Sequence, residues 1–240
     1  MSEWFETWFD SEYYHLLYKD RDYTEAEAFV EKLVTYLNPG KDALIHDLAC
    51  GKGRHSIHLN KLGLNVEGSD YSTNSINHAK KSENDRLHLY EHDMRNAMPK
   101  QYDYILNLFT SFGYFDSDEE HLNTLKHIHE GLKDDGTFVF DFMNVDFVLK
   151  HLVPREITIK NGIEFHIKRE LKNGKIIKHI AFEDEVKWHY HKEKVTALGY
   201  DKIVEMMKKC GFKVLDTFGS YHLEPFDLQS SKRLILILRK

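Results

Sequence analysis

Between residues 43 and 143, short apolar runs of strand length alternate with segments of helical pattern. The expected strands cover residues 43–49, 64–70, 86–94, 102–109 and 136–143. The expected helices cover residues 53–63, 72–82 and 117–133. Because strands that are buried on both faces read as continuous apolar runs, this alternation predicts an α/β domain with a doubly wound, mostly parallel sheet. A helix at 197–211 and strands at 212–219 and 232–240 complete it.

The first 38 residues carry a helical pattern rich in aromatic side chains. These side chains are Trp4, Phe5, Trp8, Phe9, Tyr13, Tyr14 and Tyr18. The sequence "NPG" at 38–40 stops the pattern before the first strand. We therefore expect an N-terminal helical cover over 1–40 and an α/β domain formed by 41–150 and 196–240.

The alternation breaks between residues 155 and 192. Asn-Gly pairs at 161–162 and 173–174 separate runs in which apolar and polar residues alternate. Asn-Gly between such runs is the strongest short-range hairpin signal. We expect an inserted antiparallel meander of three or four strands within 151–195. Its apolar face either covers the C-terminal edge of the sheet, which we favour, or is buried in a dimer. The residues expected on that face are Phe165, Ile167, Val186, Trp188 and Tyr190.

Composition and charge narrow the class of protein. The formal net charge is −6, which argues against a general nucleic-acid binder. The longest apolar stretch, Leu234–Leu238, has strand length rather than membrane length, so no membrane partner is expected. The acidic N-terminus lacks the pattern of a secretory signal. With Cys50 and Cys210 as the only cysteines, a reduced, cytoplasmic setting is expected.

Two histidine pairs raise the question of a metal site. His127 and His129 lie on an expected helix, where residues two apart point in different directions. His189 and His191 lie on an expected strand and share a face, so they could chelate a metal. The spacing offers no third ligand. We therefore expect a solvated strand face and no metal.

The loop "DLACGKGR" at 47–54 follows the first expected strand. Gly51 and Gly53 allow a sharp turn and close approach of a ligand to a helix N-terminus, although a plain strand-to-helix turn would look the same. Asp70 ends the second strand, where a carboxylate can accept hydrogen bonds from a ribose diol. NAD and other adenosine cofactors share this requirement.

Three features favour a cationic adenosine ligand. Residue 56 is serine, where a dinucleotide motif has glycine or alanine. Asp47 would repel a pyrophosphate but suits a positive charge. Asp93 and Met94, just past the third strand, can accept from the adenine amino group and pack on the ring. S-adenosylmethionine carries a sulfonium and an ammonium and no phosphate, so the loop suits it better than NAD.

The stretches "DLACGKGR", "EGSDYS", "HDM" and "YDYILNLFTSFGYF" resemble the successive cofactor motifs of class I S-adenosylmethionine-dependent methyltransferases. The resemblance covers roughly 24–145 and the last three elements, and it implies a seven-stranded sheet whose last strand is antiparallel. It assigns the methionine end of the cofactor to Asp47, Ala49, Gly51 and Gly53. It assigns the ribose, the adenine and the surroundings of the sulfonium to Asp70, Tyr71, Asp93, Met94, Asn107 and Leu108.

The N-terminal "YYHLLYKDRDY" resembles the segment that covers the cofactor in small-molecule methyltransferases. The resemblance implies that Tyr14, Tyr18 and Arg21 close over the methionine end, with core packing as the alternative for the tyrosines. It also implies that the meander roofs the acceptor pocket.

The function implied is methyl transfer to a nitrogen or oxygen of a small-molecule acceptor, giving S-adenosylhomocysteine. Transfer is an in-line displacement, so the protein mainly aligns the reactants. The acceptor pocket is expected to involve Ser111, Phe112, Tyr114 and Trp188. If a general base is needed, the candidates are Tyr114, His189, His191 and His222.

Other functions and assemblies stay open at this point. "TSFGYF" differs from the Asn/Asp-Pro-Pro-Tyr/Phe type of motif, which argues against a DNA or glutamine acceptor. A non-enzymatic S-adenosylmethionine-binding protein and an NAD-dependent oxidoreductase are the alternatives. The protein is expected to be a monomer or a homodimer.

Overall fold

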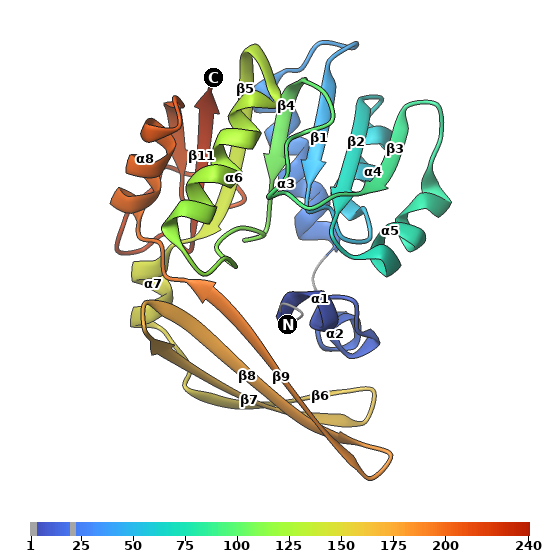
Figure 1. The fold of residues 1–240 in the computed structure, drawn as a ribbon, viewed down its shortest axis with the longest axis vertical. Coiled ribbons are helices and arrows are strands. Elements are labelled where there is room, and N and C mark those ends of the chain that lie inside the picture. Colours follow the sequence, from blue (N-terminus) through green and yellow to red (C-terminus); the bar gives the residue numbers. More distant parts are fainter. Residues whose placement is uncertain (1–3, 20–22) are drawn as a thin grey trace.

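A computed structural model describes residues 4–19 and 23–240 (Figure 1). Its larger sheet has seven strands in the order β10-β11-β5-β4-β1-β2-β3. These strands are β1 (Leu44–Leu48), β2 (Asn65–Asp70), β3 (Leu87–Glu91), β4 (Tyr102–Asn107), β5 (Leu132–Met143), β10 (Lys213–Phe218) and β11 (Arg233–Arg239). Strands β1 to β5 pair in parallel, whereas β11 is antiparallel to both neighbours. The expected doubly wound sheet with an antiparallel last strand is confirmed.

Helices cover both faces of this sheet. On one face lie α3 (Tyr23–Leu37), α4 (Arg54–Lys61), α5 (Thr73–Ala79) and the 3₁₀ turn η1 (Lys80–Ser82). On the other face lie α6 (Asp118–Glu130) and α8 (Tyr200–Lys209). Strand β11 shows why both faces need a cover, because Leu234, Leu236 and Leu238 enter one core while Ile235 and Ile237 enter the other. The N-cap of α6 is Ser117, which forms a capping box with Glu120.

The inserted segment forms a separate sheet of four antiparallel strands in chain order. These strands are β6 (Arg155–Lys160), β7 (Ile163–Lys172), β8 (Lys175–Asp184) and β9 (Lys187–Thr196). The two Asn-Gly pairs form the first two hairpin turns, with positive φ at all four residues. The third turn, Glu185-Val186, also has positive φ at both residues and carries no such sequence signal. The short helix α7 (Val145–Lys150), which leads into this sheet, was not expected.

The face assignment of β9 from sequence is wrong. Residues directly opposite each other in a ladder share a face, and His191 pairs with Ile180, which pairs with Ile167. The buried face therefore takes Phe165 and Ile167 as expected, but from β9 it takes His189 and His191. Trp188 and Tyr190 lie on the opposite, exposed face, and Val186 is a turn residue with 92% of its surface exposed. The position of the third turn decides which alternate residues of β9 face inward.

Two N-terminal helices, α1 (Trp4–Trp8) and α2 (Glu12–Leu17), lie between the meander and the larger sheet (Figure 1). Trp8 and Leu17 are buried in one cluster with Phe165, Ile180 and Phe182 of the meander. Helix α3, by contrast, belongs to the core of the α/β domain. The N-terminal cover therefore consists of α1 and α2, and it forms one packed unit with the meander. In the described part of the chain, no helix has the length and hydropathy to span a membrane.

Candidate active site

A cavity of about 450 Å³ lies where the C-terminal ends of β1 to β4 face α1, α2 and β9. Strands β2 and β3 lie on one side of β1, and β4 and β5 lie on the other, so the strand order reverses at this point. Ligands of doubly wound domains bind at such a switch point, and the volume lies in the range of small-molecule pockets. The predicted site residues on its wall are Tyr14, Tyr18, Ala49, Gly51, Asp70, Tyr71, Asp93, Met94, Leu108, Ser111 and Tyr114.

The loop after β1 turns through three left-handed residues. The φ angles of Ala49, Gly51 and Gly53 are 64°, 57° and 80°. A Cβ atom on Gly51 would meet nothing within 4 Å, so the backbone here faces open space. Gly53, in contrast, lies behind the loop as the N-cap of α4, and a Cβ there would approach Ala79 Cβ at 3.2 Å. Gly51 thus opens the loop to a ligand, while Gly53 serves the packing of α4.

Asp70 fixes the loop to the end of β2. Its Oδ2 accepts from the Gly51 N–H and its Oδ1 accepts from the Ser72 N–H, both at 2.8 Å. Burial raises the pKa of this carboxyl, and the two backbone hydrogen bonds oppose the rise. Each oxygen keeps further acceptor capacity, and the side chain lies on the cavity wall.

Asp47 does not lie on the cavity wall, contrary to the sequence-based expectation. It is buried beneath the loop and accepts a hydrogen bond from Ser56 Oγ at 2.6 Å. Burial raises its pKa to about 6, although Ser56 opposes the rise. Ser56 therefore supplies a hydrogen bond to the buried carboxylate. Asp47 does not contact a ligand in the cavity; it acts on one by supporting the loop and through the electrostatic field of its charge.

Asp93 and Met94 line the cavity beyond β3. The Arg95 guanidinium donates to both carboxylate oxygens of Asp93, at distances from 2.6 to 3.0 Å. Burial favours the neutral form of Asp93, but these hydrogen bonds prevail and lower its pKa. Asp93 is therefore an ionised acceptor at neutral pH.

The loop after β4 rests on a buried ion pair that the sequence did not reveal. Phe109 and Thr110 have φ angles of 59° and 60°. Asp141 accepts from the Phe109 N–H at 2.7 Å, and Arg233 donates to Thr110 Oγ1 at 2.9 Å. Arg233 also donates to Asp141 Oδ1 at 2.6 Å. An aspartate inside the apolar run "FVFDFM" was the available signal.

Asn107 and Leu108 precede this loop. Leu108 lies on the cavity wall, as does Ser111. Asn107 is fully buried and donates to the Leu48 carbonyl at 3.1 Å, so it ties the end of β4 to the end of β1 instead of facing the cavity.

The cover closes the cavity with aromatic rings and one carboxylate. Tyr114 packs edge-on against Trp4 and Phe9, with ring centroids 5.5 and 5.4 Å apart. Glu193 of β9 lies on the wall and accepts from Trp8 Nε1 at 2.9 Å and from the Tyr18 hydroxyl at 2.6 Å. Sequence reasoning missed Glu193, because its side of the meander depends on the third turn.

Several predicted site residues do not reach the cavity. Phe112 is buried in the α/β core, where it packs on Phe115 and His121, because its side chain points away from the ligand side of the loop. Trp188 lies on the outer side of the meander, and His222 is exposed in the segment between β10 and β11. Arg21 lies outside the described residues.

The two meander histidines serve packing in this structure. His189 stacks on Phe182 and His191 stacks on Trp8, with ring centroids 4.8 and 4.2 Å apart. Of the four candidate bases, Tyr114 alone lines the cavity. Within 4–19 and 23–240, no group of three His, Cys, Asp or Glu side chains is placed to hold a metal ion.

Comparison with known proteins relates part of the chain to a known family. Residues 45–136, from β1 to the start of β5, match a family model described as a methyltransferase domain. The dTDP-3-amino-3,4,6-trideoxy-alpha-D-glucopyranose N,N-dimethyltransferase of Streptomyces venezuelae is 28% identical over 131 residues. That match covers 53% of this chain and 54% of the relative, so the chain spans about half of that protein's length. A putative methyltransferase of Geobacillus sp. (strain WCH70) is 24% identical over 99% of both chains.

Residues 45–136 carry a methyltransferase domain, and the chain has the fold of class I S-adenosylmethionine-dependent methyltransferases. Solved structures share the fold of this chain. An S-adenosylmethionine-dependent methyltransferase from Clostridium acetobutylicum has a TM-score of 0.79 at 19% identity, with 95% of each chain covered. A sugar N-methyltransferase from Streptoalloteichus sp. has a TM-score of 0.72 at 15% identity, covering 95% of this chain and 93% of that one. These findings leave the NAD-dependent oxidoreductase and the non-enzymatic binding protein without support.

The cavity fits S-adenosylmethionine, which the description of the Clostridium acetobutylicum structure names. Gly51 leaves the loop without a side chain on the ligand side, so the backbone can approach a ligand closely. The carboxylates at the ends of β2 and β3, Asp70 and Asp93, suit a ligand with hydroxyls and an amino group.

Proposed function

We propose that this methyltransferase transfers the methyl group of S-adenosylmethionine to an amine nitrogen of a small-molecule acceptor. The names of two similar proteins, an amino-sugar N,N-dimethyltransferase and a sugar N-methyltransferase, support nitrogen as the acceptor atom. The observation that carries the proposal is the end of the cavity under the cover. There Glu193 lines the cavity together with Tyr14, Tyr18 and Tyr114, and its Oε2 lies 3.9 Å from Lys178 Nζ.

The cofactor would bind across the ends of β1, β2 and β3. In this arrangement the loop at Ala49 and Gly51 takes the methionine end, and Asp70 accepts from the ribose hydroxyls. Tyr71, Asp93 and Met94 flank the adenine. When bound, the cofactor supplies a methyl group on a positively charged sulfur. This order leaves the space beneath α1, α2 and β9 for the acceptor.

The residues of the acceptor space suit an amine. Aromatic faces attract a cation, and a carboxylate attracts it more strongly. Positive charge develops on the amine nitrogen as its lone pair forms the new bond to carbon and the bond from carbon to sulfur breaks. Glu193 would stabilise this charge. Tyr114 would align the acceptor as part of the wall, because its hydroxyl donates to the Thr110 carbonyl at 2.6 Å.

A matched pair of acceptors tests this proposal. Amino sugars and the corresponding sugars with a hydroxyl in place of the amine are compared under one set of conditions, with formation of S-adenosylhomocysteine as the readout. We expect turnover with amines and none above background with hydroxyl compounds. Glu193→Gln should raise the acceptor KM about tenfold or more and leave the affinity for S-adenosylhomocysteine within about twofold. Turnover of the hydroxyl compounds alone would contradict the proposal.

A further inference from the structure

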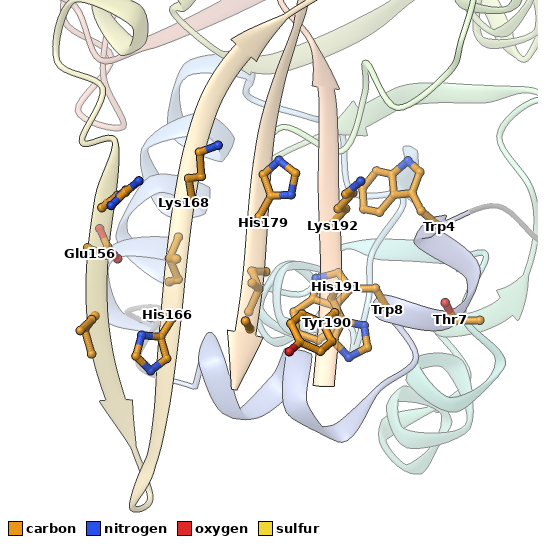
Figure 2. A pocket seen from close by; sticks show the side chains of 15 residues that line it. Trp4, Thr7, Trp8, Glu156, His166, Lys168, His179, Tyr190, His191 and Lys192 are labelled. Carbon is orange, nitrogen blue, oxygen red and sulfur yellow. The ribbon is translucent and has the colours of Figure 1, made fainter. Parts of the chain in front are cut away.

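The face of the meander that carries Trp188 and Tyr190, called the outer face below, exposes large apolar side chains. Ile157, Ile159 and Tyr190 are 59%, 64% and 73% exposed, and Trp188 is 46% exposed. Ile157 and Tyr190, with polar neighbours on the four strands and with Trp4, Thr7 and Trp8 of α1, border a hollow of about 920 Å³ (Figure 2). A contiguous exposed patch of this kind marks an interaction surface.

The register of the strands arranges this outer face in three rows that run across the sheet. The middle row consists of Ile157, His166, Ala181 and Tyr190. On one side of it, a basic row consists of Arg155, Lys168, His179 and Lys192. Figure 2 shows three of these, Lys168, His179 and Lys192, side by side on β7, β8 and β9. On the other side, two residues along each strand from the middle row, a mixed row consists of Ile159, Glu164, Glu183 and Trp188.

This order of rows is complementary to itself. A two-fold axis that runs along the middle row turns a second copy over, so that middle row meets middle row and basic row meets mixed row. Lys168 then faces Glu164 of the second copy, and His179 faces Glu183. At the β9 edge, Lys192 faces the ring of Trp188 in a cation–π arrangement. A closed two-fold interface requires this kind of self-complementarity.

We propose that the outer face of the meander is the interface of a two-fold symmetric homodimer of this chain. Within the described residues, the side chains of Arg155, Glu183 and Lys192 have no ion-pair partner. Lys168 and His179 both contact Glu170, and Glu164 contacts His166 two residues along the same strand. A second copy places charges of opposite sign against these side chains and covers Ile159 and Trp188, which lie at the two ends of the mixed row. A small anionic ligand would use the basic row alone and would leave Ile157, Ile159 and Trp188 in water.

The size of the face agrees with a stable dimer. The four strands lie about 4.8 Å apart, and each of the three longer strands has ten residues. The flat area of the sheet is therefore on the order of 600 Å², and protruding side chains add to it. A standard interface buries about 800 Å² per partner. None of the residues in the three rows lines the cavity at the ends of β1 to β4, so the proposed interface is separate from the candidate active site.

Sedimentation velocity and light scattering on the full chain test the proposal. The wild type should have twice the chain mass of 28.4 kDa at micromolar concentration. Lys168→Glu places two glutamates opposite each other, and Glu164→Lys places two lysines opposite each other. Each should raise the dimer dissociation constant at least tenfold. The double variant K168E/E164K exchanges the two charges in both copies and should return the constant to within about threefold of wild type.

Two further variants complete the test, one as a control and one that removes apolar area. Lys213→Glu on β10, remote from the meander, makes the same charge change and should leave the dimer intact. Tyr190→Ala removes apolar area without a new charge and should weaken the dimer at least tenfold, with circular dichroism to verify the fold. A monomeric wild type overturns the proposal, as does a dimer that K168E, E164K and Y190A leave unchanged. A double variant no better than the single variants overturns the proposed axis.

Discussion

Asp141 on β5 and Arg233 on β11 form a buried ion pair, with Arg233 Nη2 2.6 Å from Asp141 Oδ1, beneath the loop that follows β4. The pair holds Phe109 and Thr110 in left-handed backbone conformations, one through the Asp141 carboxylate and the other through the Arg233 guanidinium. Because Leu108 and Phe109 line the cavity, the shape of the site depends on two residues outside it.

We expect Arg233→Met to destabilise the fold by about 3–5 kcal/mol, because it leaves the Asp141 carboxylate buried without its partner. Urea denaturation measures the change. The double variant Asp141→Leu/Arg233→Met should be less destabilised than Arg233→Met alone, since no isolated charge remains. Additive losses would show that the two side chains act independently.

Asp70→Asn should weaken binding of S-adenosylhomocysteine by about 1.5–3 kcal/mol, through loss of charge-assisted hydrogen bonds to the ribose and a looser Gly51 loop. Isothermal titration calorimetry measures the affinity. Asp216→Asn, on the edge strand β10, is the matched control and should bind as wild type. Unchanged affinity in folded Asp70→Asn would remove Asp70 from the cofactor site.

Gly51→Val should reduce cofactor affinity at least tenfold and leave the fold largely intact. The left-handed backbone disfavours a β-branched residue by about 1–2 kcal/mol, and the new side chain would fill the space that faces the ligand. Gly40→Val is the control, because its Cβ also meets open space but its φ is ordinary. Equal affinities in the two variants would identify the Gly51 loop as a plain structural turn.

The buried Asp47 gives stability a defined pH dependence. Burial raises its folded-state pKa from 3.8 to about 6, so the folded protein holds this proton more tightly than the unfolded chain. Its contribution is therefore favourable at low pH and is lost as the pH rises from about 4 to about 6. Relative to Asp47→Asn, the wild type should lose about 3 kcal/mol across this window. Denaturation of both proteins at several pH values measures the difference, and parallel curves would contradict it.

The sequence predicted those parts of the protein that depend on local patterns. The apolar runs predicted the parallel sheet, and two Asn-Gly pairs predicted two hairpins, because their signals lie within a few neighbouring residues. The Gly51 loop and Asp70 followed from the spacing that a strand-to-helix turn and a strand end impose. These patterns also predicted the edge of the sheet at which the cavity lies.

The rest depended on contacts between distant residues. The turn at Glu185-Val186 lacks glycine and asparagine, so nothing local indicated its register. A shift of one residue in the pairing of β9 decides whether Trp188 or His189 faces inward. The same register places Glu193 on the cavity wall, which the sequence did not predict. The pairing of Asp141 with Arg233 joins residues on different strands, and no local pattern reports it.

The most direct test of the account is the fate of the transferred methyl group. The protein is incubated with S-adenosylmethionine that carries a deuterated or ¹³C-labelled methyl group and with an amino-sugar acceptor, and NMR locates the label in the product. We expect the label on the amine nitrogen, with one equivalent of S-adenosylhomocysteine for each methyl transferred. A label on oxygen, or S-adenosylmethionine left unchanged in the presence of every amine offered, would contradict the account.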